Sequence, residues 1–180
     1  MEHYVAFLRG MNLGIRRLKN DELRGEFEAL GFEEVATFRA SGNVIFEADG
    51  ESEAALRKKI EAGLGEGLGY EVPVFLRSAA EVAAIAARKP FAAKAVAASK
   101  GKLQVSLLAK KPAAKDRKAV LALATDEDLL AIEERELYWL PSGGTIDSDL
   151  DLKAIDKALG KGTMRTMGTI EQIAAKHCGG

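Results

Sequence analysis

The order of the elements expected in the first 77 residues is the feature that most restricts the fold. Short apolar runs rich in Val, Phe and Tyr are typical of strands, and apolar side chains spaced i, i+4 and i+7 indicate one buried face of a helix. Read in order, the expected elements are a strand Tyr4–Arg9, a helix from Asn20 to Leu30, strands Val35–Arg39 and Val44–Glu47, a helix that begins after Ser52, and a strand Glu71–Arg77. This β-α-β-β-α-β order predicts a ferredoxin-like α+β unit, with antiparallel strands in the order 4-1-3-2.

Three local signals agree with this order. Asn20 can cap the first helix, in which Leu23 and Phe27 share one buried face, and Gly31 is a typical residue for a helix end. Pro73 has no backbone N–H to donate to a neighbouring strand, so it places the fourth strand at an edge of the sheet. The 4-1-3-2 order puts the fourth strand at an edge as well.

The second half of the chain repeats the pattern more loosely. Its expected elements are a strand Leu103–Ala109, a helix from Pro112 to Ala124, a hairpin around Glu134 and Arg135, a helix Asp149–Leu159, a short strand Lys161–Arg165 and a final helix Thr169–Lys176. The predicted organisation is a first ferredoxin-like unit over residues 1–77, a connecting helix and linker over 78–101, and a second, degenerate ferredoxin-like unit with a C-terminal helix over 102–180.

The side chains that metal and redox chemistry need are scarce. Cys178 is the single cysteine, which excludes a disulfide framework and a cysteine-based zinc site. His3 and His177 stand near opposite ends of the chain, and neither has a partner at metal-ligand spacing. The glycine-rich stretch Gly63–Gly69 follows a helix instead of a strand, so it does not match a dinucleotide-binding fingerprint. We therefore expect no metal site and no cofactor.

Charge and hydropathy narrow the cellular setting. No apolar run reaches the roughly 18 residues that span a bilayer. Glu2 stands where a secretory signal would have a positive charge, so we expect a cytoplasmic protein that does not enter the membrane. The net charge of −1 argues against a general nucleic-acid coat protein, although it is compatible with a local basic patch.

Three segments are expected to meet at one end of the first sheet. In a β-α-β-β-α-β unit, the end of the first strand, the turn between strands two and three and the start of strand four lie at the same end. We call this end the rim; it includes the loop Arg9–Arg17, the turn Ser41–Asn43 and the glycine-rich segment Gly63–Gly69. Guanidinium groups, amides, a hydroxyl and backbone N–H groups exposed by glycine are the groups that bind anions in proteins.

The sequence therefore predicts that the rim binds a small anionic ligand, either phosphorylated or nucleotide-like. The candidate ligand-binding residues, the last of them from the second half of the chain, are Arg9, Asn12, Arg16, Arg39, Ser41, Gly42, Asn43 and Arg165. Each also has a structural interpretation. Asn12 and Asn43 can satisfy backbone groups of their turns, and Arg39 can pair with a nearby glutamate.

Two other functions stay open at this stage. The first is nucleic-acid binding through the same basic rim, with Tyr4, Phe7 and Phe46 as candidate stacking side chains. It is not favoured, because the first strand has the pattern of a strand buried on both faces. The second is an enzyme of unassigned reaction, for which no nucleophile–base pair, metal set or cofactor motif identifies catalytic residues.

Four stretches of the sequence have the character of family motifs. They are YVAFLRGMNLG, LRGEFEALGFEEVATFRASGNVIFEA, VPVFLRSAAE and, near residue 148, SDLDLKAIDKALG. Together they resemble the bacterial family called domain of unknown function 1697, over nearly the whole chain. The resemblance implies a pair of ferredoxin-like units and no particular activity. The signature positions that it implies are Arg9, Gly10, Asn12, Ser41, Gly42 and Asn43.

The C-terminal motif of that family is matched in part. The family pattern is Thr-x-Arg-Asn-aromatic-Arg/Asn-Thr, and Thr163, Arg165 and Thr169 agree with it. The chain departs from the pattern at Thr166, Met167 and Gly168. A site completed by this motif would have lost an amide and an aromatic face in this protein.

Overall fold

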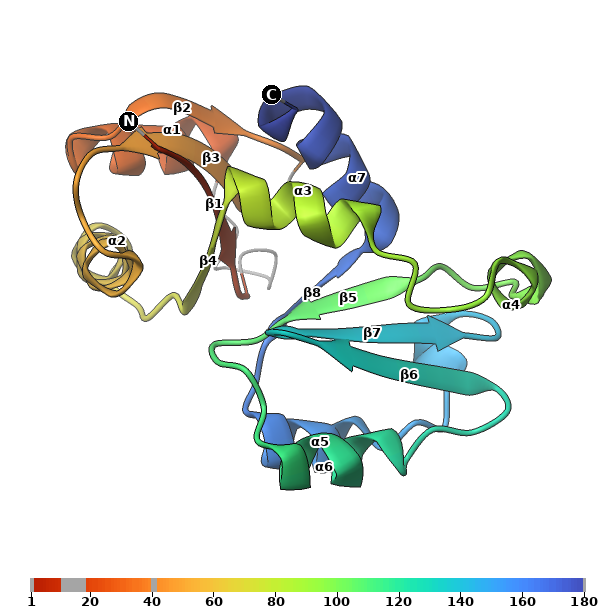
Figure 1. Ribbon diagram of the computed structural model, residues 1–180. Coiled ribbons are helices and arrows are strands. Elements are labelled where there is room, and N and C mark those ends of the chain that lie inside the picture. Colours follow the sequence, from red (N-terminus) through yellow and green to blue (C-terminus); the bar gives the residue numbers. More distant parts are fainter. Residues whose placement is uncertain (1, 11–18, 40–41, 180) are drawn as a thin grey trace. The chain divides into compact units, whose positions relative to one another are not determined.

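The chain folds into two compact units. The computed structural model describes residues 2–10, 19–39 and 42–179 (Figure 1). The first unit contains the residues up to Ile85 together with the C-terminal segment from Ile173, and the second contains Ala86–Gln172. This division differs from the expected one, because the end of the chain belongs to the first unit instead of the second.

The first unit has the predicted ferredoxin-like topology. Its elements are β1 (Glu2–Leu8), α1 (Asn20–Ala29), β2 (Glu33–Thr37), β3 (Asn43–Ala48), α2 (Glu53–Leu68), β4 (Val74–Ser78) and the first part of α3 (Ala79–Ala87). The strands form one sheet in the order β2-β3-β1-β4, and every neighbouring pair is antiparallel. The predicted 4-1-3-2 order is confirmed, and β4, which follows Pro73, lies at the edge.

The core of this unit lies between the sheet and the pair of helices α1 and α2. Phe46 of β3 stands at its centre, with its ring centroid 5.6 Å from that of Phe27 and 4.6 Å from that of Phe32. The alternate residues Val5 and Phe7 of β1 point to the other face of the sheet and are also fully buried. Burial on both faces explains why the β1 sequence is an almost unbroken apolar run.

Two local expectations about the helices are wrong. Lys19 occupies the N-cap of α1, so Asn20 is the first helical residue and no side chain caps the helix. The glycine-rich stretch Gly63–Gly69 was expected to follow the helix, but α2 continues to Leu68. Leu56, Ile60 and Leu64 form its buried face, and a Cβ at Gly63 would come within 2.6 Å of the side chain of Leu30, the residue that ends α1. Burial of this face offsets the low helix propensity of glycine.

The second unit repeats the topology of the first in full. Its elements are α4 (Ala93–Ala98), β5 (Gln104–Leu107), α5 (Ala114–Leu121), β6 (Asp128–Glu133), β7 (Glu136–Pro141), a short 3₁₀ turn (Thr145–Asp147), α6 (Leu152–Leu159), β8 (Thr163–Thr166) and α7 (Met167–Ile173). The strand order β6-β7-β5-β8 is that of the first sheet, again wholly antiparallel. The second copy is degenerate in sequence and complete in topology.

Matching contacts support an internal duplication. Arg77 of β4 lies opposite Val5, and Arg165 of β8 lies opposite Val105 at the equivalent register. Both arginines are buried, and each donates from Nη1 to the carbonyl oxygen of the residue before it, at 2.8 and 2.9 Å. A helix begins directly after each strand. The two units therefore share side-chain detail as well as strand order.

The second core includes a buried polar cluster. Trp139 is 1% exposed and donates from Nε1 to Oδ1 of Asp128 at 2.9 Å, and Ser148 donates to the same oxygen at 2.8 Å. Trp139 is thus a packing residue, since its ring is inaccessible and its N–H is satisfied inside the unit.

Candidate functional site

Backbone hydrogen bonds bring the end of β1 together with two other segments. The amide of Leu8 donates to the carbonyl oxygen of Gly42 at 2.8 Å, and the amide of Arg9 donates to that of Pro73 at 3.1 Å. In addition, the amide of Val74 donates to the carboxylate of Glu61 on α2, at 3.1 Å. The strand end, the turn before β3 and the start of β4 therefore lie at one end of the sheet.

The turn between β2 and β3 is closed by Asn43. Its side chain is fully buried and donates from Nδ2 to the carbonyl oxygen of Phe38 at 2.9 Å. Its backbone oxygen accepts a hydrogen bond from the amide of Phe38 at 3.0 Å. Gly42 has a φ of 79° and Gly10 a φ of 77°, in the left-handed region where glycine is strongly favoured. These three signature positions thus have a structural role in shaping the rim.

Two arginines of the rim lie in the described part of the chain. Arg9 is half-buried, and its guanidinium forms no hydrogen bond or ion pair with any residue that the structure describes. Arg39 is exposed, has a φ of 59°, and its guanidinium carbon lies 5.5 Å from the centroid of the Phe38 ring. Asn12, Arg16 and Ser41, the other candidates of the rim, lie outside the described residues.

The structure adds His177 to this end of the first unit. It lies on a π-helical turn, Ala174–Cys178, with its ring centroid 6.5 Å from that of Phe38 in an edge-to-face arrangement. Its Nε2 atom is buried and has no hydrogen-bond partner among the described residues. Burial and the neighbouring Lys176 lower the pKa of His177, so the imidazole is neutral at pH 7. No sequence pattern indicates this position, because it depends on the C-terminal segment joining the first unit.

Arg165 has its described contacts within the second unit. It is 8% exposed and donates to the hydroxyl of Thr163 at 2.8 Å and to the carbonyl oxygen of Met164 at 2.9 Å. Burial lowers its pKa to about 10, because the charged form loses solvation. Arg77, its equivalent in the first unit, is a buried arginine that the sequence analysis did not single out.

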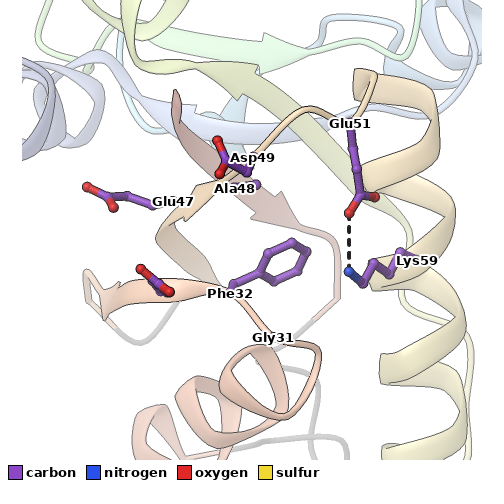
Figure 2. Close-up of a pocket in the computed structure, with 8 residues that line it drawn as sticks. Gly31, Phe32, Glu47, Ala48, Asp49, Glu51 and Lys59 are labelled. Atoms are coloured by element: carbon purple, nitrogen blue, oxygen red, sulfur yellow. Dashed lines mark hydrogen bonds and ion pairs between the residues drawn. The ribbon is translucent and has the colours of Figure 1, made fainter. Parts of the chain in front are cut away.

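A pocket lies at the opposite end of the first sheet, where β1 begins (Figure 2). Its volume is about 210 Å³, and it is lined by Gly31, Phe32, Glu33, Glu47, Ala48, Asp49, Glu51 and Lys59. Lys59 Nζ lies 3.3 Å from Oε1 of Glu51 and 5.0 Å from the centroid of the Phe32 ring. The lining has four carboxylates and one ammonium group, so its net charge is negative. This charge makes the pocket unsuitable for an anion. It is therefore distinct in chemistry from the rim.

Metal-ligand clusters are absent from the part of the chain that the structure describes. Among residues 2–10, 19–39 and 42–179, no group of three or more His, Cys, Asp or Glu side chains is arranged to hold a metal ion. None of the described helices is long and apolar enough to cross a membrane.

Taken together, these features define a two-unit α+β protein with ferredoxin-like topology and a cationic loop cluster at one end of its first sheet. The chain belongs to the family described as "Protein of unknown function (DUF1697)", whose family model matches residues 1–138. This confirms the resemblance of its N-terminal motifs to that family.

A solved structure supports the fold assignment independently. The chain is similar to a structure described as that of the conserved bacterial protein SP0830 from Streptococcus pneumoniae, with a TM-score of 0.73 and 20% sequence identity over 97% of each chain. At this level of identity the similarity confirms the fold. No curated protein matches the chain.

Proposed function

We propose that the protein binds a small anionic ligand, phosphorylated or nucleotide-like, at the rim of its first unit. The observation that supports this proposal most directly is the state of Arg9. Its backbone amide is bonded to Pro73, the residue is half-buried, and its guanidinium has no partner among residues 2–10, 19–39 and 42–179. A guanidinium without an internal partner can bind an external anion, which supplies charge-assisted hydrogen bonds.

The surrounding groups suit the same chemistry. Arg39 adds a second positive charge, and its left-handed backbone costs about 1–2 kcal/mol, a strain that often marks functional positions. Gly10 and Gly42 leave the backbone open to close approach by a ligand. We include Asn12, Arg16 and Ser41 in the proposed site on the strength of the sequence. The proposal does not depend on Arg165, whose Nη1 donates to Thr163 and Met164 of its own strand β8.

Nucleic-acid binding at the same rim is the weaker alternative. Sheet surfaces of this topology bind single strands by stacking bases on exposed aromatic side chains. Here Tyr4 is 7% exposed, and Phe7 and Phe46 are fully buried, so none of these three rings is available for stacking. A small ligand needs no such platform.

The proposal is tested by titrating the ¹⁵N-labelled full chain with inorganic phosphate, a hexose phosphate and adenosine monophosphate. We expect saturable shifts of the amides of Arg9, Gly10, Gly42 and Asn43 with at least one of the three. Replacing one charged hydrogen-bond donor should cost about 1.5–3 kcal/mol, so Arg9→Gln should weaken binding roughly ten-fold or more.

A matched control is Arg24→Gln on α1. Arg24 is also partly exposed, but it lies near carboxylates of its own helix, at 3.9 Å from Asp21 and 3.8 Å from Glu28. This variant has the same change in charge and should bind like the wild type. Absence of shifts at the four amides with all three anions would rule out the proposed site.

We also propose a cytoplasmic location, where phosphorylated metabolites and nucleotides are abundant. Fractionation of a bacterial host that expresses the full chain tests this. The protein should be recovered in the cytoplasmic fraction, and recovery in the periplasmic or membrane fraction would contradict the proposal.

A further inference from the structure

Basic residues are concentrated in one part of the second unit. Residues 88–115 contain eight lysines and arginines and no aspartate or glutamate, whereas the whole chain has a net charge of −1. The remainder of the chain is therefore net negative. Such separation of charge within a near-neutral protein produces a local positive field that the net charge conceals.

The helix α4 in this stretch packs against little of its own unit. It has six residues, none of them buried, and no side chain caps its start. Val96, its largest apolar side chain, is 40% exposed. Isolated helices shorter than about 12 residues are marginal in water, so α4 lacks the packing that normally stabilises so short a helix. In Figure 1, α4 stands beyond the ends of strands β5 and β7.

The base of α4 is nevertheless firmly attached. The hydroxyl of Ser99 donates to the carbonyl oxygen of Pro141, and the amide of Lys100 donates to that of Ser142 at 3.0 Å. A Cβ at Gly101 would collide with the carbonyl oxygen of Gly143, so the chain approaches the end of β7 closely at this point. These contacts hold the helix in one position relative to the second sheet.

The lysines around α4 are available for an external partner. Lys89, Lys94, Lys100 and Lys102 are all exposed, and none of them forms an ion pair with any residue that the structure describes. Of the other basic residues in this stretch, Lys111 lies 3.6 Å from Glu134 and Arg88 is paired with Glu136, whereas Lys110 and Lys115 are exposed like the lysines around α4. We call residues 89–102, which carry Lys89, Lys94, Lys100 and Lys102 on and beside α4, the basic arm.

We propose that the basic arm binds the phosphate backbone of double-stranded nucleic acid, without regard to sequence. Charge complementarity identifies an anionic partner, and several mobile lysines along one segment suit a regular row of phosphates. Phe91 is the single aromatic residue of the arm and is half-buried, which disfavours stacking of unpaired bases. One exposed valine on a six-residue helix is too little apolar surface to insert into a bilayer interface.

The interaction is independent of the rim, and fluorescence anisotropy of a labelled 24-base-pair DNA duplex of mixed sequence tests it. The full chain should bind, and its affinity should fall as NaCl rises from 50 to 200 mM. Each phosphate contact adds about 0.9 to the slope of log K against log salt. The triple variant Lys94→Gln, Lys100→Gln and Lys102→Gln should therefore lower that slope by about 2–3 and weaken binding at 50 mM salt at least ten-fold.

Two control variants make the result specific. Lys153→Gln, Lys157→Gln and Lys161→Gln change the same charge at exposed positions on and beyond α6, and they should leave affinity and slope as in the wild type. Arg9→Gln at the rim should also leave duplex binding unchanged. An unshuffled and a shuffled duplex should bind equally well.

Four outcomes would overturn the proposal. They are absence of duplex binding at 50 mM salt, an equal loss in the α6 control, a loss confined to Arg9→Gln, and binding of anionic phospholipid vesicles in place of the duplex. The third outcome would assign nucleic-acid binding to the rim, and the fourth would assign the basic arm to a membrane surface. The first, second and fourth outcomes have no bearing on the titration of the rim with small anions, and that titration decides the rim proposal by itself, so the two proposals fail separately.

Discussion

The role of Asn43 leads to the sharpest prediction about the first unit. Its buried amide closes the β2–β3 turn by donating to the carbonyl oxygen of Phe38 at 2.9 Å. The variant Asn43→Ala removes this donor, so the carbonyl oxygen of Phe38 loses one hydrogen bond. It also leaves a cavity the size of the three side-chain heavy atoms that are removed. An unmade buried hydrogen bond costs about 1–3 kcal/mol, and the cavity adds about 1 kcal/mol more.

The expected loss of stability is therefore about 2–4 kcal/mol. For a chain of this size, that corresponds to a fall in Tm of about 5–15 °C. Urea unfolding followed by far-UV circular dichroism measures the loss, and hydrogen exchange at the amide of Leu8, which is bonded to Gly42, localises it to the rim. Fluorescence of Trp139, the single tryptophan, reports on the second unit separately.

The matched control is Asn20→Ala, the same substitution in the same unit. Asn20 makes no capping bond at the start of α1, so its replacement should change stability by less than about 0.5 kcal/mol. If Asn43→Ala is as mild as Asn20→Ala, the amide does not hold the turn and the reasoning is refuted. If Asn43→Ala abolishes anion binding while stability is unchanged, the role of Asn43 is to bind the ligand and not to stabilise the fold.

Three further predictions concern buried polar groups. Asp128→Ala should lower the free energy of unfolding by about 3–5 kcal/mol, because it removes two hydrogen bonds to a carboxylate and leaves the buried N–H of Trp139 without an acceptor. Asp128→Asn keeps an acceptor oxygen and should cost less than half as much. Equal losses for the two variants in tryptophan-monitored unfolding would contradict this. The pKa of Tyr4 is raised to about 12, and the largest cause is its hydrogen bond to the carboxylate of Glu2. The pKa of Tyr138 is also raised to about 12, and the largest cause there is burial. Unfolded tyrosine ionises near pH 10, so the stability gained by keeping these phenols neutral is complete below pH 10 and lost between pH 10 and 12. Absorbance at 295 nm should show both ionising around pH 12, and titration of either near pH 10 would be inconsistent with the structure. Burial is the largest cause of the lowered pKa of His177. As pH drops below about 6.5, the unfolded chain therefore binds the proton more readily than the folded protein, and stability should fall. His177→Gln should flatten this pH dependence in thermal melts at pH 5–8, and an unchanged slope would disprove the contribution.

The candidate site divides into parts that the sequence predicted and parts that it did not. Topology alone predicted that the end of β1, the turn before β3 and the start of β4 meet, and the bonds from Leu8 to Gly42 and from Arg9 to Pro73 agree with it. Whether a given polar side chain in the rim is paired could not be predicted. Asn43 is engaged in the fold, while Arg9 has no side-chain partner among the described residues, because pairing depends on which residues distant in the chain come close together.

The glycines of α2 illustrate the same limit for the fold. Taken alone, the four glycines indicate a frayed helix end, since glycine has low helix propensity. In the structure the helix continues to Leu68, and Leu56, Ile60 and Leu64 along it are fully buried in the core of the first unit. Propensity is a property of the local chain, whereas this burial depends on the sheet and on α1.

What the sequence by itself determined is the set of strands and helices, their order and therefore the strand arrangement of both sheets. These elements depend on local patterns, namely the spacing of apolar residues, proline at a sheet edge and glycine in turns. Each pattern extends over a few residues, so it can be recognised in the sequence alone. The tertiary structure alone decided that the C-terminal segment joins the first unit and that Arg77 and Arg165 are buried. It also decided that Arg9 and the lysines of the basic arm have no ion pair within the described part of the chain. Each of these depends on solvation and contacts between segments far apart in the chain, and no local pattern encodes them.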